Sequence, residues 1–304
     1  MRRILFVVSI LTTSWVSQSA GTAFADASLE LSTALRTDSF RWNIAGDING
    51  QTPNVLSELT WKDLKISELR LKGRATYNGV VYLRGDLGHG SIYSGAVQDS
   101  DYAGDGRTLE SSRTNNSSDD GSVWDASFGA GFRSALLSGK PGLDVIPMLG
   151  YSYRAQDLKI TNGLSTIPPT GPFPGLDSTY QARWQGPWVG IDLVYVLRRL
   201  TLNASIEYHR AVYRAQADWN LRTDFVHPKS FEHKAGGDGA ELNLSAAYAL
   251  SKRWSLKAGL DLRKWRAVNG TDTTFFVDGT SAVTHLNEAE WNSTAFSAGV
   301  SYAF

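Results

Sequence analysis

The sequence predicts an all-β chain whose strands close into a ten-stranded antiparallel transmembrane β-barrel of the outer membrane. Three observations lead to this class. Apolar and polar residues alternate strictly near the C-terminus, the N-terminus has the composition of an export signal, and polar breaks divide the remainder into a regular series. Alternation with a period of two indicates strands that have one apolar and one polar face.

The last two predicted strands carry the clearest alternation. The apolar positions share one parity over residues 254–263, and the same holds over residues 296–304. A closing strand with aromatic residues at its end, apolar toward lipid and small or polar toward the lumen, is typical of outer-membrane barrels. The alternative for such a pattern is a soluble antiparallel sandwich.

The N-terminus favours the barrel because it reads as a secretory signal. Two arginines precede an apolar core over residues 4–11, and residues 23–25 form a small-x-small cleavage site. We therefore expect a signal peptide at residues 1–25 and a single β-barrel domain at residues 26–304, in the outer membrane of a Gram-negative bacterium. Later apolar runs are shorter than the ~18 residues that a membrane helix needs.

Composition argues against several other classes. The 30 Lys and Arg balance the 30 Asp and Glu, and no basic cluster marks the chain as a nucleic-acid-binding protein. There is no Cys and therefore no disulfide framework. The 29 Gly, 10 Trp, 12 Tyr and 12 Phe suit a barrel, where glycine eases crowded packing and aromatic residues lie at the membrane interfaces. No metal and no cofactor is expected.

Polar breaks divide the chain in an alternating way. Long breaks lie at residues 46–53, 94–121, 161–177, 216–239 and 269–287. Short breaks lie at residues 65–73, 138–142, 198–199 and 251–253. These five long and four short breaks leave ten strands. An even strand number, short periplasmic turns and long outer loops are what a bacterial barrel requires.

Most of the strands have a recognisable apolar core. In chain order these cores are Leu29, Leu31 and Leu35; Leu59, Trp61 and Leu64; Val81, Leu83 and Leu87; Leu143, Val145 and Leu149; Leu200, Leu202, Ile206 and Tyr208; and Leu242 and Leu244. A spanning strand needs only ~9–11 residues. Several strands should therefore project beyond the bilayer, and residues 79–101 look like such a case.

An acidic pair stands at the outer end of the third predicted strand. Asp99 and Asp101 are two residues apart, so on a strand their side chains point to the same face. Two carboxylates held close do not both ionise easily, so they can share a proton and help to activate a water molecule. The alternative is an ordinary acidic pair in a solvated loop.

Short motifs spread over the mature chain resemble those of a known family. They are Ser57-Glu58-Leu59-Thr60-Trp61-Lys62, Val97-Gln98-Asp99-Ser100-Asp101-Tyr102, Pro187-Trp188-Val189-Gly190, Glu207-Tyr208 and Ser301-Tyr302-Ala303-Phe304. With the order of strands and loops, they resemble the omptins, outer-membrane aspartic-type endopeptidases with a ten-stranded barrel. The resemblance is clearest in the first two motifs, and the loops are too divergent to align.

The resemblance implies a site at the outer mouth of the barrel. Asp99 and Asp101 match the catalytic aspartate pair of the family. Asp218 matches the Asp of a dyad whose His orients or deprotonates a water molecule, but the His position holds Asn220. Gln216 stands where the family has an acid that binds a basic residue of the substrate. The implied partner is a peptide or protein substrate.

The departure at Asn220 has chemical consequences. Asn does not accept a proton from water at neutral pH, and losing a general base typically costs ~10²–10⁴ in rate. His227 and His233 lie in the adjacent loop, and either could replace the base only if the loop folds back toward Asn220. His209 lies ~35 Å from Asn220 along an extended strand. Asp218 shares the strand parity assigned to lipid, so it faces the mouth only if a bulge intervenes.

The second trait implied by the resemblance is binding of lipopolysaccharide, the one bound lipid expected here. Arg183 matches a position of the family that contacts this lipid, and an arginine at the outer interface can pair with lipid phosphates. An ordinary rim arginine is the alternative.

Three functions therefore remain open. The chain is a catalytically silent omptin-like barrel with weak or no proteolysis, an active endopeptidase that uses Asp99, Asp101 and Asp218, or a small-solute pore. The aspartate pair favours the enzyme, and Asn220 and Gln216 favour the silent barrel. The polar lumen positions suit a pore, although ten strands enclose a narrow interior that side chains fill.

Overall fold

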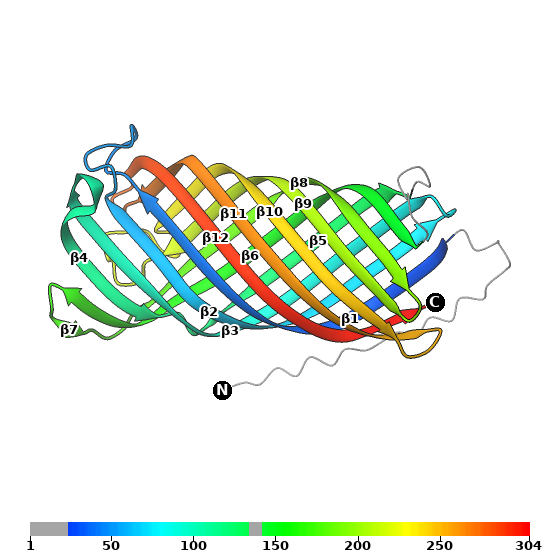
Figure 1. Ribbon diagram of the computed structural model, residues 1–304. Coiled ribbons are helices and arrows are strands. Elements are labelled where there is room, and N and C mark those ends of the chain that lie inside the picture. The colour runs from blue at the N-terminus through cyan, green and yellow to red at the C-terminus, as the bar shows by residue number, and fades with distance from the viewer. Residues whose placement is uncertain (1–23, 134–141) are drawn as a thin grey trace.

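The computed structural model describes residues 24–133 and 142–304, which form one closed antiparallel β-barrel (Figure 1). The predicted signal peptide at residues 1–25 lies almost entirely outside the described residues. No helix among the described residues is long and apolar enough to cross a membrane. The predicted fold class, an all-β outer-membrane barrel with ten antiparallel strands in the ring, is confirmed.

The strands are long, as the sequence led us to expect. They are β1 (Phe24–Ile44), β2 (Ser57–Tyr77), β3 (Val81–Gly104), β4 (Thr108–Ser117), β5 (Gly121–Phe132), β6 (Leu143–Ile167), β7 (Gly171–Pro172), β8 (Asp177–Leu197), β9 (Leu200–Asp218), β10 (Phe231–Ala249), β11 (Trp254–Phe275) and β12 (Ser281–Ala303), with a 3-10 turn η1 (Asp105–Arg107). Most ring strands have about twice the ~9–11 residues that a spanning strand needs, so the barrel extends well beyond a bilayer.

Consecutive strands pair around the ring, and the first strand closes it against the last. The closing pair runs from Ser28 opposite Ala303 to Ile44 opposite Leu286. β4 and β5 occupy one position of the ring, because both pair with β3 and with β6, while β7 pairs with β6 off the ring. In Figure 1 the C-terminus and the short turns lie at the right end, and β4 and β7 lie at the left, outer end.

Several predicted breaks are shorter than expected or wrong. The short break at residues 65–73 is wrong, because it lies inside β2, and the turn follows at residues 78–80. Glu68 and Arg70 make this stretch polar, yet both are buried in the lumen, while Leu69 and Leu71 are exposed on the outer face. The long breaks at residues 94–121 and 269–287 are also mostly strand, and residues 216–239 are half strand. The connections there shrink to residues 105–107 and 118–120, to 276–280 and to 219–230.

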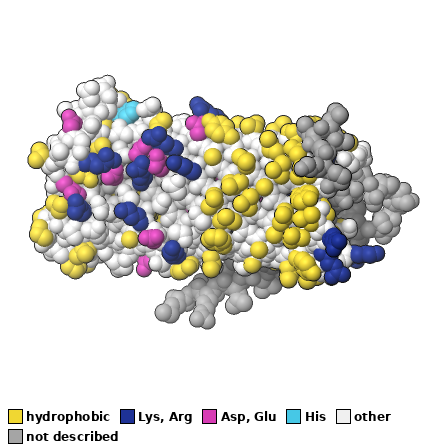
Figure 2. Space-filling view, viewed as in Figure 1, with side chains coloured by type: hydrophobic (Ala, Val, Ile, Leu, Met, Phe, Trp, Pro, Cys, Tyr) yellow, Lys and Arg dark blue, Asp and Glu magenta, His cyan; other side chains and the backbone are white. Residues whose placement is uncertain are grey.

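The outer surface divides into an apolar belt and a charged half. Figure 2 shows apolar side chains over the half nearer the C-terminus and Lys, Arg, Asp and Glu over the other half. Exposed residues of the belt include Leu35, Ile206 and Phe296. Above the belt, Arg41 pairs with Glu288 and Glu290 on the outside of the wall. An apolar band below a charged rim is the surface of a barrel set in an outer membrane.

The lumen is filled by two layers of side chains. The lower layer is a network of buried ion pairs that includes Arg36 with Asp38 and Arg154 with Glu241. The upper layer is a hydrophobic cluster dominated by aromatic rings, among them Phe40, Trp42, Trp61, Tyr180, Trp184, Tyr213, Phe231, Trp265 and Trp291. Leu59, Trp61 and Leu64 belong to this upper layer, so the apolar core predicted for the second strand faces the interior rather than lipid.

A bulge between β2 and β3 decides which way the acidic pair points. The register shifts between Lys62 and Ile66, where Asp63 has a positive φ of 53°. On β3, Tyr82 and Ile92 are buried below the shift. Above it, Val97 and Asp99 lie opposite Trp61 and Leu59 of the aromatic layer, so the odd positions face inward there. The bulge therefore turns Asp99 and Asp101 to the inside.

The aromatic layer should require glycine at position 239, because the ring of Trp265 leaves no room for a side chain there. A Cβ added to Gly239 would lie 2.5–2.7 Å from ring atoms of Trp265. We expect Gly239→Ala to destabilise the barrel by ~1–3 kcal/mol, the usual cost of overpacking, measured as the loss of free energy of unfolding in urea for the refolded barrel.

Gly236→Ala on the same strand is the matched control. An added Cβ there meets nothing within 4 Å. If the two variants unfolded at the same urea concentration, the packing of Trp265 against Gly239 would not limit stability.

Candidate functional site

Asp99 and Asp101 line the inner wall at the outer end of β3. Asp99 lies opposite Leu59 of β2, and Asp101 lies opposite Ser57. Directly below them, Val97 pairs with Trp61, and both are buried in the aromatic layer. The two carboxyl groups are half-buried. They therefore form an acidic wall above an apolar floor.

Burial and mutual repulsion change the proton affinity of this pair. Burial, and then the negative charge of Asp101, raise the pKa of Asp99 to about 8, against the opposing charge of Arg222. Burial also raises the pKa of Asp101, opposed by a hydrogen bond from the Ser57 hydroxyl and by Arg222. The pair therefore shares a proton near neutral pH, as expected of adjacent carboxyl groups.

Asp218 contacts a histidine, but this histidine, His227, comes from the loop after β9 and not from position 220. Nδ1 of His227 lies 2.5 Å from Oδ1 of Asp218, and Nε2 of His227 lies 3.2 Å from the backbone carbonyl of Arg222. Asp218 is the last residue of β9 and keeps the outward parity of Tyr208, with no bulge in the pairing of β9 with β10. The contact exists because the loop after β9 folds back over the strand end.

The partners of His227 define its protonation state. An ionised carboxylate and a backbone carbonyl only accept hydrogen bonds, so both ring nitrogens must donate. The hydrogen bond with Asp218 raises the pKa of His227, in agreement with this geometry. In this arrangement His227 is an imidazolium ion whose nitrogens are both occupied, and it has no lone pair for a water molecule.

Arg222 connects the two halves of the site. Its guanidinium group pairs with Asp224 and stacks 3.9 Å from the ring centroid of Phe225. Its positive charge acts on Asp99 and Asp101, and its carbonyl accepts from His227. The loop at residues 219–230 thus carries a cation toward the acidic wall.

Asn220, in the loop after β9, and Gln216, on β9, occupy different positions from Asp218. The side chain of Asn220 accepts from the backbone N–H of Asp177 and donates to the carbonyl of Gly175, so it anchors a neighbouring loop. Gln216 is exposed on the outside of the wall, where it donates to Gln181. Arg183 lies on the outer face, as expected of a rim arginine, and donates to Asp157 at 2.5 Å.

Sequence reasoning missed two features of the site. Arg222 carried no signal in the pattern, because a lone arginine in a loop has no periodic neighbours. The buried chain from Tyr213 through Tyr180 to His233 and Asp272 was also missed, with contacts of 2.5, 2.8 and 3.1 Å. This chain lies among the rings below the mouth and links the hydroxyl groups of Tyr213 and Tyr180 to Nδ1 of His233.

Comparison with known proteins defines the family. The chain belongs to the Protochlamydia outer membrane protein family, which it matches over residues 30–304. No curated protein matches it. The family match and the barrel together place the protein in the outer membrane.

Among solved structures, the chain is similar to the outer membrane protease OmpT from Escherichia coli, with a TM-score of 0.70 and 14% identity over 92% of this chain and 97% of that chain. It also matches the translocator domain of the autotransporter NalP from Neisseria meningitidis, with a TM-score of 0.38 and 12% identity over 92% and 89% of the two chains. A Pseudomonas aeruginosa FadL homologue matches with a TM-score of 0.30 and 12% identity over 92% and 90%. At 14% identity, the similarity to OmpT shows a shared fold.

The contact between His227 and Asp218 should give the barrel a defined pH dependence. Because the folded-state pKa of His227 is raised, its contribution to stability is complete below ~6.5, the ordinary pKa of His, and is lost as the pH rises through the folded-state value. We expect His227→Gln to lower the thermal unfolding temperature at pH 6 and to have little effect at pH 9.

His89→Gln is a suitable control, because the ring of His89 contacts the backbone carbonyl of Val123. A difference between wild type and His227→Gln that grew toward alkaline pH would contradict the charged pair.

Proposed function

We propose that this barrel is a surface binding protein whose outer mouth takes a cationic group, such as a basic side chain of a peptide, with weak or no proteolysis. One observation carries the proposal. The acidic wall of Asp99 and Asp101 faces inward above an aromatic floor, while the only imidazole paired with Asp218 in the described structure has both nitrogens occupied.

The acidic wall supports binding. A guanidinium or ammonium group beside Asp99 and Asp101 would favour release of their shared proton and gain charge-assisted hydrogen bonds. The indole and phenyl faces of Trp42, Trp61 and Phe231 lie in the layer below and suit the apolar part of such a side chain. Arg222 already brings one cation of this type toward the wall.

The same geometry argues against efficient hydrolysis. A general base must hold a lone pair within hydrogen-bond reach of the attacking water. His227 offers none while it donates to Asp218 and to the carbonyl of Arg222. Asn220 supplies no base either, because its amide is committed to the loop at Gly175 and Asp177.

An active endopeptidase is the second candidate, and a specific contact favours it. The pair of Asp218 and His227 has the chemistry of the dyad found in omptins, with the histidine supplied by the loop. If His227 releases the carbonyl of Arg222 and loses a proton, its Nε2 becomes a base. This route requires the loop to open.

A small-solute pore has less support. Buried ion pairs and the aromatic cluster fill the described lumen from the level of Arg36 to the level of Trp42. Lipopolysaccharide remains a proposed lipid partner. Arg183 is engaged by Asp157 and by backbone carbonyls, so a lipid phosphate would have to share its guanidinium group.

The test is binding and cleavage of a fluorescein-labelled Arg-Arg peptide by the refolded barrel in the presence of lipopolysaccharide. We expect saturable binding that weakens at least ~10-fold in the double variant Asp99→Asn with Asp101→Asn, since a charge-assisted hydrogen bond contributes ~1.5–3 kcal/mol. Cleavage should stay at background between pH 6 and pH 8.

Asp119→Asn with Asp120→Asn is the matched control, because these exposed acids lie in the connection between β4 and β5, outside the mouth. Binding that is equal in both double variants would refute the cationic site. Robust cleavage that disappears in His227→Gln would establish the endopeptidase instead.

A further inference from the structure

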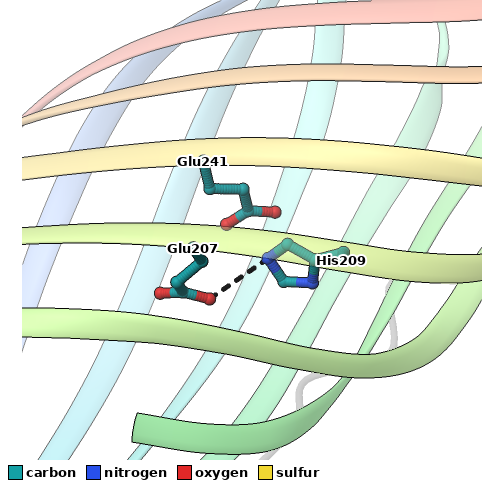
Figure 3. Close-up of side chains that lie close together, drawn as sticks. All are labelled: Glu207, His209 and Glu241. Carbon is teal, nitrogen blue, oxygen red and sulfur yellow. Dashed lines mark ion pairs between the residues drawn. The ribbon is translucent and has the colours of Figure 1, made fainter. Parts of the chain in front are cut away.

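The second cluster of interest lies deep in the lumen, below the proposed binding site. Glu207 and His209 on β9 and Glu241 on β10 turn toward one another inside the barrel (Figure 3). One ligand atom of each lies within 4.8 Å of the other two, and all three side chains are buried. The cluster lies at the boundary between the ion-pair layer and the aromatic layer, where the His209 ring centroid is 4.7 Å from that of Trp265.

The strand register sets two like charges against each other. Glu207 and Glu241 are direct cross-strand partners, so their side chains leave neighbouring backbone positions on the same face. Like charges in directly opposed positions destabilise a sheet. Such a pair in a buried place calls for a cation between the carboxylates.

His209 is oriented as a ligand would be. Its Nδ1 lies 2.9 Å from the hydroxyl oxygen of Ser152, which can accept the Nδ1 proton and leave the Nε2 lone pair free. That Nε2 lies 3.2 Å from Oε2 of Glu207, yet neither atom has a hydrogen-bond partner. A second residue that fixes the tautomer of a histidine is the usual support of a metal-binding imidazole.

The cluster lies within a network of ion pairs. Three arginines, Arg84, Arg154 and Arg263, pair with the carboxylates around the cluster. Among the described residues, these three arginines pair with five carboxylates: Asp86, Asp125, Asp192, Glu207 and Glu241.

A fourth arginine, Arg36, also contacts Asp125, but it is shared with Asp38 and Glu68. In direct ion pairs these five carboxylates outnumber the four arginines, while Lys72 and Arg74 act on Asp86 and Asp192 from a greater distance. Arg154 donates to both oxygens of Glu241, and Arg84 donates to Oε1 of Glu207, so Oε2 of Glu207 is left without a hydrogen bond and is the oxygen nearest His209.

We infer that Glu207, His209 and Glu241 form a binding site for a divalent transition-metal ion of the Zn²⁺ class. One imidazole and two carboxylates are a ligand set that suits such ions. A polar cavity of about 60 Å³, lined by Glu207 and Glu241, adjoins the cluster and has space for water ligands on the open side. Bound metal ties β9 to β10 and relieves the repulsion of the two glutamates.

The experiment uses the full barrel, refolded, washed with EDTA and titrated with Zn²⁺ alone, with Mg²⁺ as a hard-cation comparison. We expect one Zn²⁺ per chain by elemental analysis and a higher thermal unfolding temperature with Zn²⁺ than with Mg²⁺. His209→Gln and Glu207→Gln should each weaken Zn²⁺ binding by ~10–100-fold or more. Glu207→Gln serves as the second variant in case His209→Gln fails to refold.

The control is His233→Gln, which changes another buried histidine that faces a single carboxylate, Asp272, at 3.1 Å. This variant should bind Zn²⁺ like wild type. Absence of stoichiometric Zn²⁺ on the wild-type barrel, or equal uptake by wild type and Glu207→Gln, would overturn the site.

Discussion

The structure depends on a buried ion-pair network centred on Asp125. This carboxylate accepts from Arg36 of β1 at 2.9 Å and from Arg263 of β11 at 2.6 Å, and it lies 3.8 Å from Arg154 of β6. Strands far apart around the ring are thereby joined across the lumen. Removing one partner of such a network leaves uncompensated buried charge, which typically costs ~3–5 kcal/mol. The network thus both supports the wall and fills the interior.

A filled interior places function at the ends of the barrel. The aromatic layer rests on the charged layer, linked to it by the indole N–H of Trp291, which donates to Asp38 at 2.9 Å. Above the rings, the bulge at Asp63 turns Asp99 and Asp101 inward, and the loop after β9 brings Arg222 and His227 to the rim. The acidic wall therefore lies above closed layers of side chains, an arrangement that suits binding better than transport.

Much of this fold follows from alternation in the sequence. The outward parity of Leu29, Leu31 and Leu35 and of Phe296 and Val300 was predictable, because lipid admits only apolar side chains and the side-chain period of a strand is two. The break predicted at residues 65–73 failed for the opposite reason. A lumen that buries ions makes strand interiors as polar as loops, and pattern alone does not separate a paired Glu68 or Arg70 from a solvated one. The inward turn of the acidic pair required a bulge, and the partner of Asp218 required a loop contact. Both depend on three-dimensional packing that periodicity does not encode.

The most direct test of a closed lumen is electrical conductance of the refolded barrel in a planar lipid bilayer. The ion pairs around Asp125 and the rings above them predict no stable conducting steps for the wild-type protein. Reproducible single-channel steps would contradict the account, because they would show that ions pass through layers that should be closed and that the pore is the function to pursue.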